Sequence, residues 1–333
     1  MKFLTIILIS CLLLVSCEKA FFEADLASTA PMDNFEYLWK ECNEKYSYFE
    51  LKGIDWDMVK IAYAAKVYEG MTDDSLFNVL GGMLTELQDD HANLFSDFNT
   101  SFYGVEYLGQ DNFDWRILVD NYLSQDYYIS GPFAHDFLEH DQIGYIRLSS
   151  FSEEIKVENL DFILERYKDT KGLILDLREN GGGAIANVFN ILSRFVASES
   201  LVNYSRIKTG SGHHEFSTPE PVIVQPFNGI RYNKPIAVLT DRGTYSSGSL
   251  LALATKALPN MTLIGDTTGG GLGMPNGGQL PNGWTYRFSV TQSLTLDKKP
   301  DFENGVPPDI NILLDWSDRT KDEILDRAIL ELL

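Results

Sequence analysis

The chain has 333 residues, of which 44% are hydrophobic and 23% are charged. This composition is typical of a globular protein with one large domain or two modest ones, and it excludes a disordered chain. The formal net charge is −21. A field of that sign repels phosphate backbones and attracts cationic peptides, so we do not expect nucleic-acid binding.

The first residues carry a targeting pattern. One lysine precedes an apolar run from Phe3 to Val15, which is too short for a comfortable membrane span and fits a secretory signal. The run ends in Leu-Val-Ser-Cys, which resembles the bacterial lipoprotein signal. We therefore expect a signal peptide over 1–16, a lipid on Cys17, a linker over 17–32 and a place in the cell envelope, on a periplasmic or outer-membrane face. A plain signal peptide and an anchor helix remain the alternatives.

The next segment, residues 33–98, is helical in pattern. Apolar side chains recur at helical spacing in 33–50, 53–69 and 73–90, and short links join these stretches. Cys42 lies on the apolar face of the first stretch and is interpreted as a small core residue. The pattern predicts an N-terminal subdomain of three helices.

The remaining sequence changes character twice. Residues 99–140 are rich in Tyr, Phe and Asp without a long period, so we expect irregular strands and loops there. From residue 141 to 333, continuous apolar strands alternate with amphipathic helices, which predicts a mixed, largely parallel α/β core. The expected core strands are 143–151, 171–183, 234–243 and 261–271, followed by a β-rich stretch at 284–297 and a helix at 321–333.

Two expected strand ends carry polar chemistry. One runs into Gly181, Gly182 and Gly183, and the other into a helix start that contains Ser246 and Ser247. Sites in α/β sheets form beyond the carboxyl ends of parallel strands. Glycines let backbone amides approach a ligand, and a helix start has free amides, so the two ends could hold an oxyanion. Taken singly, the glycines fit a tight turn and Ser246 fits an N-cap.

A serine nucleophile needs a base. His91 follows the third helical stretch directly after Asp89 and Asp90, and both carboxylates would favour its protonated form. The alternative is a surface histidine after an acidic helix end. The other four histidines stand in loop-like segments, at His135, His140, His213 and His214. His213 and His214 lack metal-ligand spacing, so no metal and no organic cofactor are expected.

Seven stretches in sequence order resemble the tail-specific or C-terminal-processing serine peptidases. They are DNFEYLWKECNEKYSYFELKGIDWD, LTELQDDHANL, IGYIRLSSF, GLILDLRENGGG, VLTDRGTYSSGSLLALA, IGDTTGGG and FENGVPPDI. The resemblance implies a crotonase-like arrangement of the core and a peptidase that forms an acyl-enzyme. It implies that Ser246 is the nucleophile, rather than Ser247 or Ser249. The amide of Ser247 and that of Gly182 or Gly183 would form the oxyanion hole.

The chain departs from the larger branch of that family. Where that branch has a lysine base, this sequence has Gly271, and Lys256 and Lys298 lie well away from that position. About 50 residues separate His91 from the first core strand, too few for a PDZ insert. In both respects the chain resembles the branch that includes the tricorn core and the nisin-resistance proteases. This resemblance implies that His91 is the base.

In that branch the residue before the histidine and a glutamate near the C-terminal end orient the ring, which here implies Asp90 and Glu303. We therefore expect a lipid-anchored serine peptidase that acts on proteins or peptides. Two alternatives remain: a non-catalytic ligand-binding protein on the same fold, and a narrow immunity peptidase that cleaves a cationic antimicrobial peptide. The sequence does not indicate an oligomeric state.

Overall fold

The computed structural model describes residues 27–333. The predicted signal peptide and the lipidation site at Cys17 lie outside the described residues. Within 27–333, no helix is both long enough and apolar enough to cross a bilayer.

The N-terminal part forms a helical unit, as the sequence predicts, although the first of the three expected helices ends early and is followed by a separate short helix. Its helices are α2 (Pro31–Lys45), α3 (Phe49–Lys52), α4 (Trp56–Ala64) and α5 (Asp73–Thr85). The Asp55 side chain caps α4, and Thr72 caps α5. Cys42 is fully buried in the core of this unit, which confirms the interpretation of it as a core residue.

A small antiparallel sheet closes the helical unit, and most of it comes from the far end of the chain. The strands are β1 (Asn93–Phe95), β10 (Pro275–Gln279) and β11 (Thr285–Ser289), in the order β1-β11-β10. Tyr286 and Phe288 of β11 pack in the same hydrophobic cluster as α2 and α5. The helical unit is therefore completed by residues that the sequence pattern assigned to the core.

The segment expected to be irregular contains more regular structure than predicted. It holds the 3₁₀ helix η1 (Val105–Leu108), α6 (Trp115–Asn121), β2 (Tyr128–Ser130) and β3 (Phe133–Leu138). The strands β2 and β3 form a hairpin that extends the main sheet as an antiparallel edge. The sheet therefore begins before residue 141.

The main sheet has seven strands in the order β13-β9-β8-β5-β4-β3-β2. The strands from β13 to β4 are parallel, and only β3 runs the other way, because β2 is antiparallel to β3 in turn. The parallel strands are β4 (Ile143–Leu148), β5 (Gly172–Asp176), β8 (Ile236–Thr240), β9 (Met261–Gly265) and β13 (Ile310–Asn311). This arrangement confirms the predicted mixed, largely parallel α/β core.

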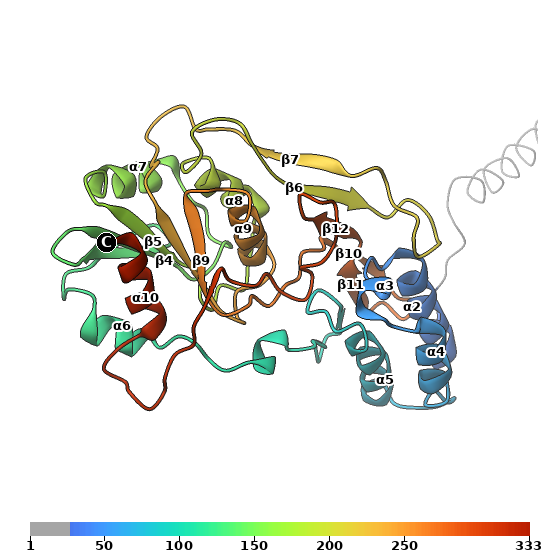
Figure 1. The fold of residues 1–333 in the computed structure, drawn as a ribbon. Helices are drawn as coiled ribbons and strands as arrows, with labels where there is room; N and C mark the ends of the chain where they lie inside the picture. Colours follow the sequence, from blue (N-terminus) through green and yellow to red (C-terminus); the bar gives the residue numbers. More distant parts are fainter. Residues whose placement is uncertain (1–26) are drawn as a thin grey trace, which may run out of the picture.

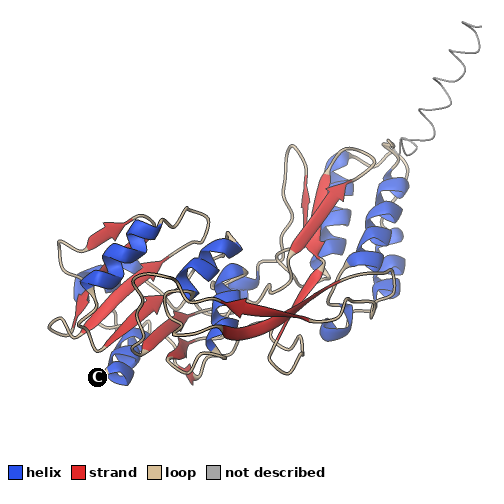
Figure 2. Ribbon diagram, turned by 90° about the horizontal axis from the view of Figure 1, so that it is seen from above, coloured by secondary structure: helices blue, strands red, loops and turns tan. Residues whose placement is uncertain are grey.

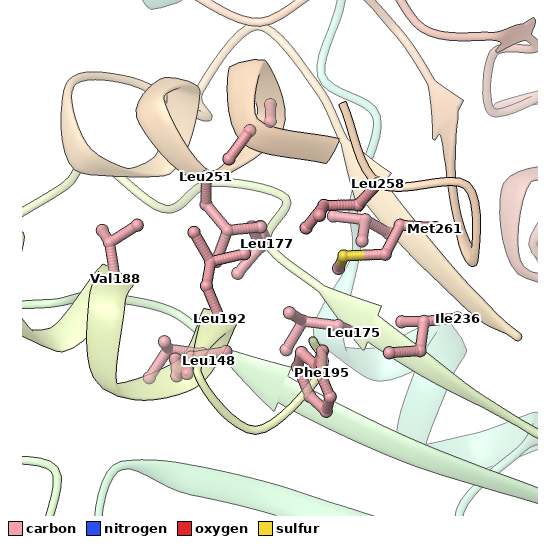
Figure 3. Packing of buried hydrophobic residues seen from close by; sticks show 14 of the residues in the cluster. Leu148, Leu175, Leu177, Val188, Leu192, Phe195, Ile236, Leu251, Leu258 and Met261 are labelled. Atoms are coloured by element: carbon pink, nitrogen blue, oxygen red, sulfur yellow. The ribbon is translucent and has the colours of Figure 1, made fainter. Parts of the chain in front are cut away.

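Helices cover both faces of this sheet (Figure 2). Leu173 and Leu175 of β5 point into one hydrophobic cluster, while Ile174 points into another on the opposite face. The first face is covered by α7 (Val157–Arg166), α8 (Ile185–Leu192) and α9 (Ser247–Thr255), and the second by α6 and α10 (Glu323–Leu332). Figure 3 shows the first cluster, in which leucines of α9 and α8 meet the side chains of the strands below them.

A third sheet joins the core to the helical unit. Its order is β12-β6-β7, with β6 (Ser200–Ile207), β7 (Glu220–Val224) and β12 (Thr291–Leu294). The strand β6 runs from the core toward the helical unit, and β7 returns beside it (Figure 1). At the far end, the His213 ring stacks on Phe49 at 4.5 Å between centroids, and its Nε2 lies 3.0 Å from Asn43 Oδ1.

Candidate active site

Ser246 lies where β8 passes into α9. Its backbone has φ 54° and ψ −117°, a conformation that normally favours glycine. The amide of Ser246 donates to the carbonyl of Gly270 at 2.9 Å, and the serine side chain makes no capping hydrogen bond to α9. The hydroxyl is therefore not used as an N-cap.

The glycine loop lies directly beside this turn. Asn180 holds the two together, because its carbonyl accepts the amide of Tyr245 at 2.9 Å and its Oδ1 accepts the amide of Gly182 at 3.0 Å. Gly182 has φ 98°, and a Cβ there would lie 2.8 Å from the Cβ of Ser246. Only glycine allows this close approach of the loop to Ser246.

The amides near Ser246 differ from the predicted oxyanion hole in one respect. The amide of Gly182 is already bound to Asn180, so it is not available to a ligand. For Gly183 and Ser247, no amide hydrogen bond to another described group is present. The Ser247 hydroxyl donates to the Gly183 carbonyl at 2.7 Å and so holds these two segments together. The available pair of donors is therefore Gly183 and Ser247.

His91 comes from the helical unit, in the loop after α5. Its Nε2 lies 3.0 Å from Ser246 Oγ, although 155 positions separate the two residues. The ring is 6% exposed and stands at a steep angle to Tyr245, with 5.0 Å between the centroids. Its Nδ1 is buried and has no hydrogen-bond partner among residues 27–333. The structure thus brings together the two residues that the sequence proposed as nucleophile and base.

The pKa of His91 is lower than the ordinary value, which corrects the expectation that the neighbouring carboxylates would hold it up. Burial is the largest cause and lowers the pKa, because a desolvated imidazolium is unfavourable. Asp89 opposes this shift most strongly, while Arg287 on β11 lowers the pKa further. The carbonyl of Gly273 and the Asp90 carboxylate raise it less. Desolvation therefore outweighs the carboxylates, and the ring is mostly neutral at neutral pH.

Asp90 does not orient the ring as predicted. Its carboxylate accepts three backbone amides, from Tyr103 at 2.9 Å, Gly104 at 2.5 Å and Val105 at 2.7 Å. These bonds fold the start of the following loop around the carboxylate. Asp90 precedes His91 in the chain, but its side chain stabilises the loop at 103–105 and makes no hydrogen bond to the ring.

Glu303 is buried under the site and holds a loop. Its Oε2 accepts the amides of Leu272 at 2.7 Å and Gly273 at 3.1 Å. Burial raises its pKa to about 8, and the nearby Asp89 adds to the shift while Lys52 opposes it. No hydrogen bond joins Glu303 to His91 within the described part of the chain, so Glu303 does not orient the ring by direct contact.

The lysines named from the sequence lie away from Ser246. Lys256 pairs with Asp309 at 2.6 Å, and the ammonium of Lys298 lies 4.7 Å from the centre of the Tyr204 ring. Neither residue lines the cavity at Ser246.

Sequence reasoning missed Lys52, the last residue of α3. Its side chain is 2% exposed, and its Nζ donates to the carbonyls of Leu87 at 3.2 Å and Gln88 at 2.8 Å. The same Nζ lies 3.8 Å from Glu303 Oε1. A single lysine at a helix end has no local signal that marks it as buried.

Ser246 and His91 open into a cavity of about 880 Å³ between the core and the helical unit. One part of its wall is apolar and includes Ile185 and Phe189 of α8 and Leu250 of α9. Ile185 and Phe189 are four residues apart and so share one helix face. The cavity is large enough for several residues of an extended chain.

Comparisons with known proteins place the chain in a peptidase family. Residues 142–312 match the sequence profile of Peptidase family S41, and residues 28–85 match that of the Tricorn protease C1 domain. The carboxy-terminal processing protease CtpA of Bacillus subtilis is 29% identical over 175 residues, which cover 52% of this chain and 35% of CtpA. The nisin-resistance protein of Lactococcus lactis subsp. lactis is 30% identical over 146 residues, covering 42% of this chain and 45% of that protein. The chain thus spans about a third of CtpA.

Among solved structures, a putative peptidase from Parabacteroides merdae superposes with a TM-score of 0.87 at 39% identity, covering 92% of this chain and 98% of that one. The likeness therefore extends over the helical unit and the core together. The profile match over the core alone spans more than half of the chain. These matches support the prediction of a serine-type peptidase, and the chain belongs to peptidase family S41.

Proposed function

We propose that this protein is a serine peptidase in which Ser246 is the nucleophile and His91 the general base. The observation that carries the proposal is the 3.0 Å separation of Ser246 Oγ and His91 Nε2 at the wall of a large cavity. A nucleophile and its base must lie within hydrogen-bonding reach, and this pair does so across two separately packed units.

The chemistry follows from these contacts. His91 takes the hydroxyl proton on Nε2 while Ser246 Oγ bonds to the peptide carbonyl carbon. The negative charge that develops on the carbonyl oxygen is stabilised by the amides of Gly183 and Ser247. The ring then gives the proton to the leaving amine, and a water molecule hydrolyses the acyl-enzyme in the reverse order of steps. The lowered pKa of His91 keeps the ring able to accept a proton at neutral pH.

The cavity indicates one feature of the substrate. Leu250 lies one helical turn after Ser246, and with Ile185 and Phe189 it gives the wall an apolar patch beside the nucleophile. We propose that this patch receives an apolar side chain next to the scissile bond. The name of the relative CtpA refers to carboxy-terminal processing, and we propose the same class of reaction for this chain.

The sequence features of the leader support a lipid anchor. From the Leu-Val-Ser-Cys pattern we propose a lipid on Cys17, which would hold the peptidase at a membrane surface of the cell envelope. The 50 or so residues between His91 and β4 contain η1, α6, β2 and β3, and we assign the chain to the branch without a PDZ insert.

A fluorophosphonate probe and a peptide library test the proposal. The probe should label wild-type protein at Ser246, and mass spectrometry of the digested library should show new carboxyl termini with apolar residues enriched beside the cut. A Ser246→Ala protein is the matched control and should do neither. A wild-type protein that folds but reacts with neither reagent would instead be a ligand-binding protein on the same fold.

A narrower substrate is a second candidate, favoured by the match to the nisin-resistance protein and by the net charge of −21. A cationic antimicrobial peptide would be attracted to such a protein. Comparing kcat/KM for a cationic lantibiotic and for an unfolded neutral peptide distinguishes the two. A large preference for the lantibiotic supports the immunity function, and equal values exclude it.

A further inference from the structure

Asp89 connects the base to the nucleophile turn. Its side chain is buried, and Oδ1 accepts the backbone amide of His91 at 2.8 Å and the hydroxyl of Tyr245 at 3.0 Å. Oδ2 accepts the hydroxyl of Ser289 on β11 at 2.8 Å. One carboxylate thus binds the base, the residue before Ser246 and the sheet that closes the helical unit.

The groups around Asp89 keep it ionised. The residues that face it from the packed elements are Tyr46 and Tyr48 after α2, Lys52 of α3, His91 on its own loop, Tyr245, Ser289 and Glu303. Burial raises the pKa of Asp89, but Lys52, His91 and the hydrogen bonds together lower it below the ordinary value. For Glu303 the balance is reversed, because burial and the charge of Asp89 outweigh Lys52 and raise its pKa to about 8. Lys52 thus lowers the pKa of both carboxyl groups, and of the two, Asp89 is the one that stays ionised.

The same carboxylate acts on the ring of His91. Of the groups that face the ring, Asp89 is the strongest that favours the protonated form, and Arg287 on β11 is the strongest charge that disfavours it. Asp90 is occupied by three backbone amides, and Glu303 by two. Of these three carboxyl groups, only Asp89 is bound both to His91 and to Tyr245, the residue before the nucleophile.

We propose that Asp89 is the positioning carboxylate that fixes His91 beside Ser246 and stabilises the imidazolium formed during catalysis. This inference rests on the proposed function of the site. When the Ser246 O–H bond breaks, the proton forms a bond to Nε2 of His91 and later passes to the leaving group. Asp89 gains no proton at any step and supplies only charge and hydrogen bonds.

The rate at which a fluorophosphonate labels Ser246, measured as a function of pH, tests this role without a known substrate. In the wild type, the rate should rise along one limb as His91 loses its proton. Asp89→Asn keeps the size of the side chain but removes its charge. It should move the midpoint of the limb to lower pH by about one unit and reduce the plateau rate about tenfold or more. Asp90→Asn is the adjacent matched control and should move the midpoint less.

Variants of Lys52 provide a second, independent test of the role of Asp89. Lys52→Met lets Asp89 take up a proton, so it should shift the limb in the same direction as Asp89→Asn, and Lys52→Arg should restore the wild-type midpoint. If Asp89→Asn does not fold, judged by its circular dichroism, the two Lys52 variants carry the test alone. Identical midpoints in the wild type, Asp89→Asn and Lys52→Met would overturn the inference while leaving the serine peptidase intact. A wild type that is never labelled would overturn the proposed function itself.

Discussion

The two walls of the active-site cavity are built in different ways. The nucleophile wall comes from the ends of two neighbouring parallel strands, β5 and β8, and its parts lie within 176–183 and 241–247. The base wall, together with the buried groups that lie behind its lining, is assembled from five distant segments that contribute Lys52, residues 89–91, residues 271–273, β11 and Glu303. The nucleophile wall follows from the order of the strands alone. The base wall depends on how the helical unit packs against segments from the C-terminal half of the chain.

The largest expected effect tests the nucleophile wall. Ser246→Ala should reduce peptide hydrolysis by about 10⁴-fold or more, because no other hydroxyl replaces the nucleophile. Ser247→Ala is the matched control, since it removes only the hydroxyl that donates to Gly183 and keeps the backbone amide. Its activity should fall about tenfold or less. An inactive Ser247→Ala beside an active Ser246→Ala would show that the nucleophile is misassigned.

The next effect tests the base wall. His91→Gln should reduce kcat/KM by about 10³-fold or more and remove its dependence on pH. In the wild type a protonated ring cannot accept a proton, so kcat/KM should rise as pH increases through the pKa of His91. Because burial lowers that pKa, the midpoint should lie below about 6.5, the ordinary value for histidine.

Lys256→Ala is the control for the base, since Lys256 pairs with Asp309 away from the cavity. The Lys256→Ala variant should keep the rise of kcat/KM with pH and most of the activity. A folded His91→Gln protein with wild-type kcat/KM would mean that another group is the base.

A smaller effect compares two glycines of the nucleophile wall, Gly183 and Gly181. Gly183 has φ 140°, and a Cβ there would lie 2.3 Å from the carbonyl carbon of Phe151, so Gly183→Ala strains the backbone. We expect a loss of about 3 kcal/mol in the free energy of unfolding. A Cβ at Gly181 has nothing within 4 Å, so Gly181→Ala should stay within about 0.5 kcal/mol of the wild type. Urea unfolding of both variants measures the difference, and equal losses would refute the packing described for this loop.

The smallest effect concerns the buried charges of the base wall. The pKa of Glu303 is raised to about 8 in the folded protein, while the unfolded carboxyl titrates near its ordinary value of about 4.5. Between these values only the unfolded chain releases the proton, so the contribution of Glu303 to stability is present below about pH 4.5 and declines as pH rises to about 8.

Glu303→Gln removes that dependence. Its free energy of unfolding should fall less than that of the wild type between pH 5 and 8, by on the order of 2 kcal/mol. Parallel curves for the two proteins, measured by urea unfolding across that range, would show that Glu303 does not keep its proton in the folded state.

The contrast between the walls also explains what the sequence could predict. The parallel core, the glycine loop and the serine-containing helix start follow from apolar strands whose ends must meet at one edge of a sheet. The choice of Ser246 among its neighbouring serines came from the family resemblance. His91 stands out in the sequence because Asp89 and Asp90 directly precede it after a helix, and the family resemblance implies its role. Lys52 and the true partner of Asp90 could not be found, because their contacts depend on tertiary packing that leaves no periodic trace. The same holds for β10 and β11, which return to the helical unit from almost 200 residues away.

The backbone of Ser246 has a consequence for molecular evolution. A serine at φ 54° and ψ −117° costs about 1–3 kcal/mol relative to a residue that adopts this conformation freely, and its side chain makes no compensating capping bond. Glycine would therefore give a more stable protein at this position, and Ser246→Gly should be more stable than Ser246→Ala. If selection for activity were lost while selection for stability remained, this serine would be among the first residues to be replaced. Its presence is a trade of stability for chemistry that folding alone does not explain.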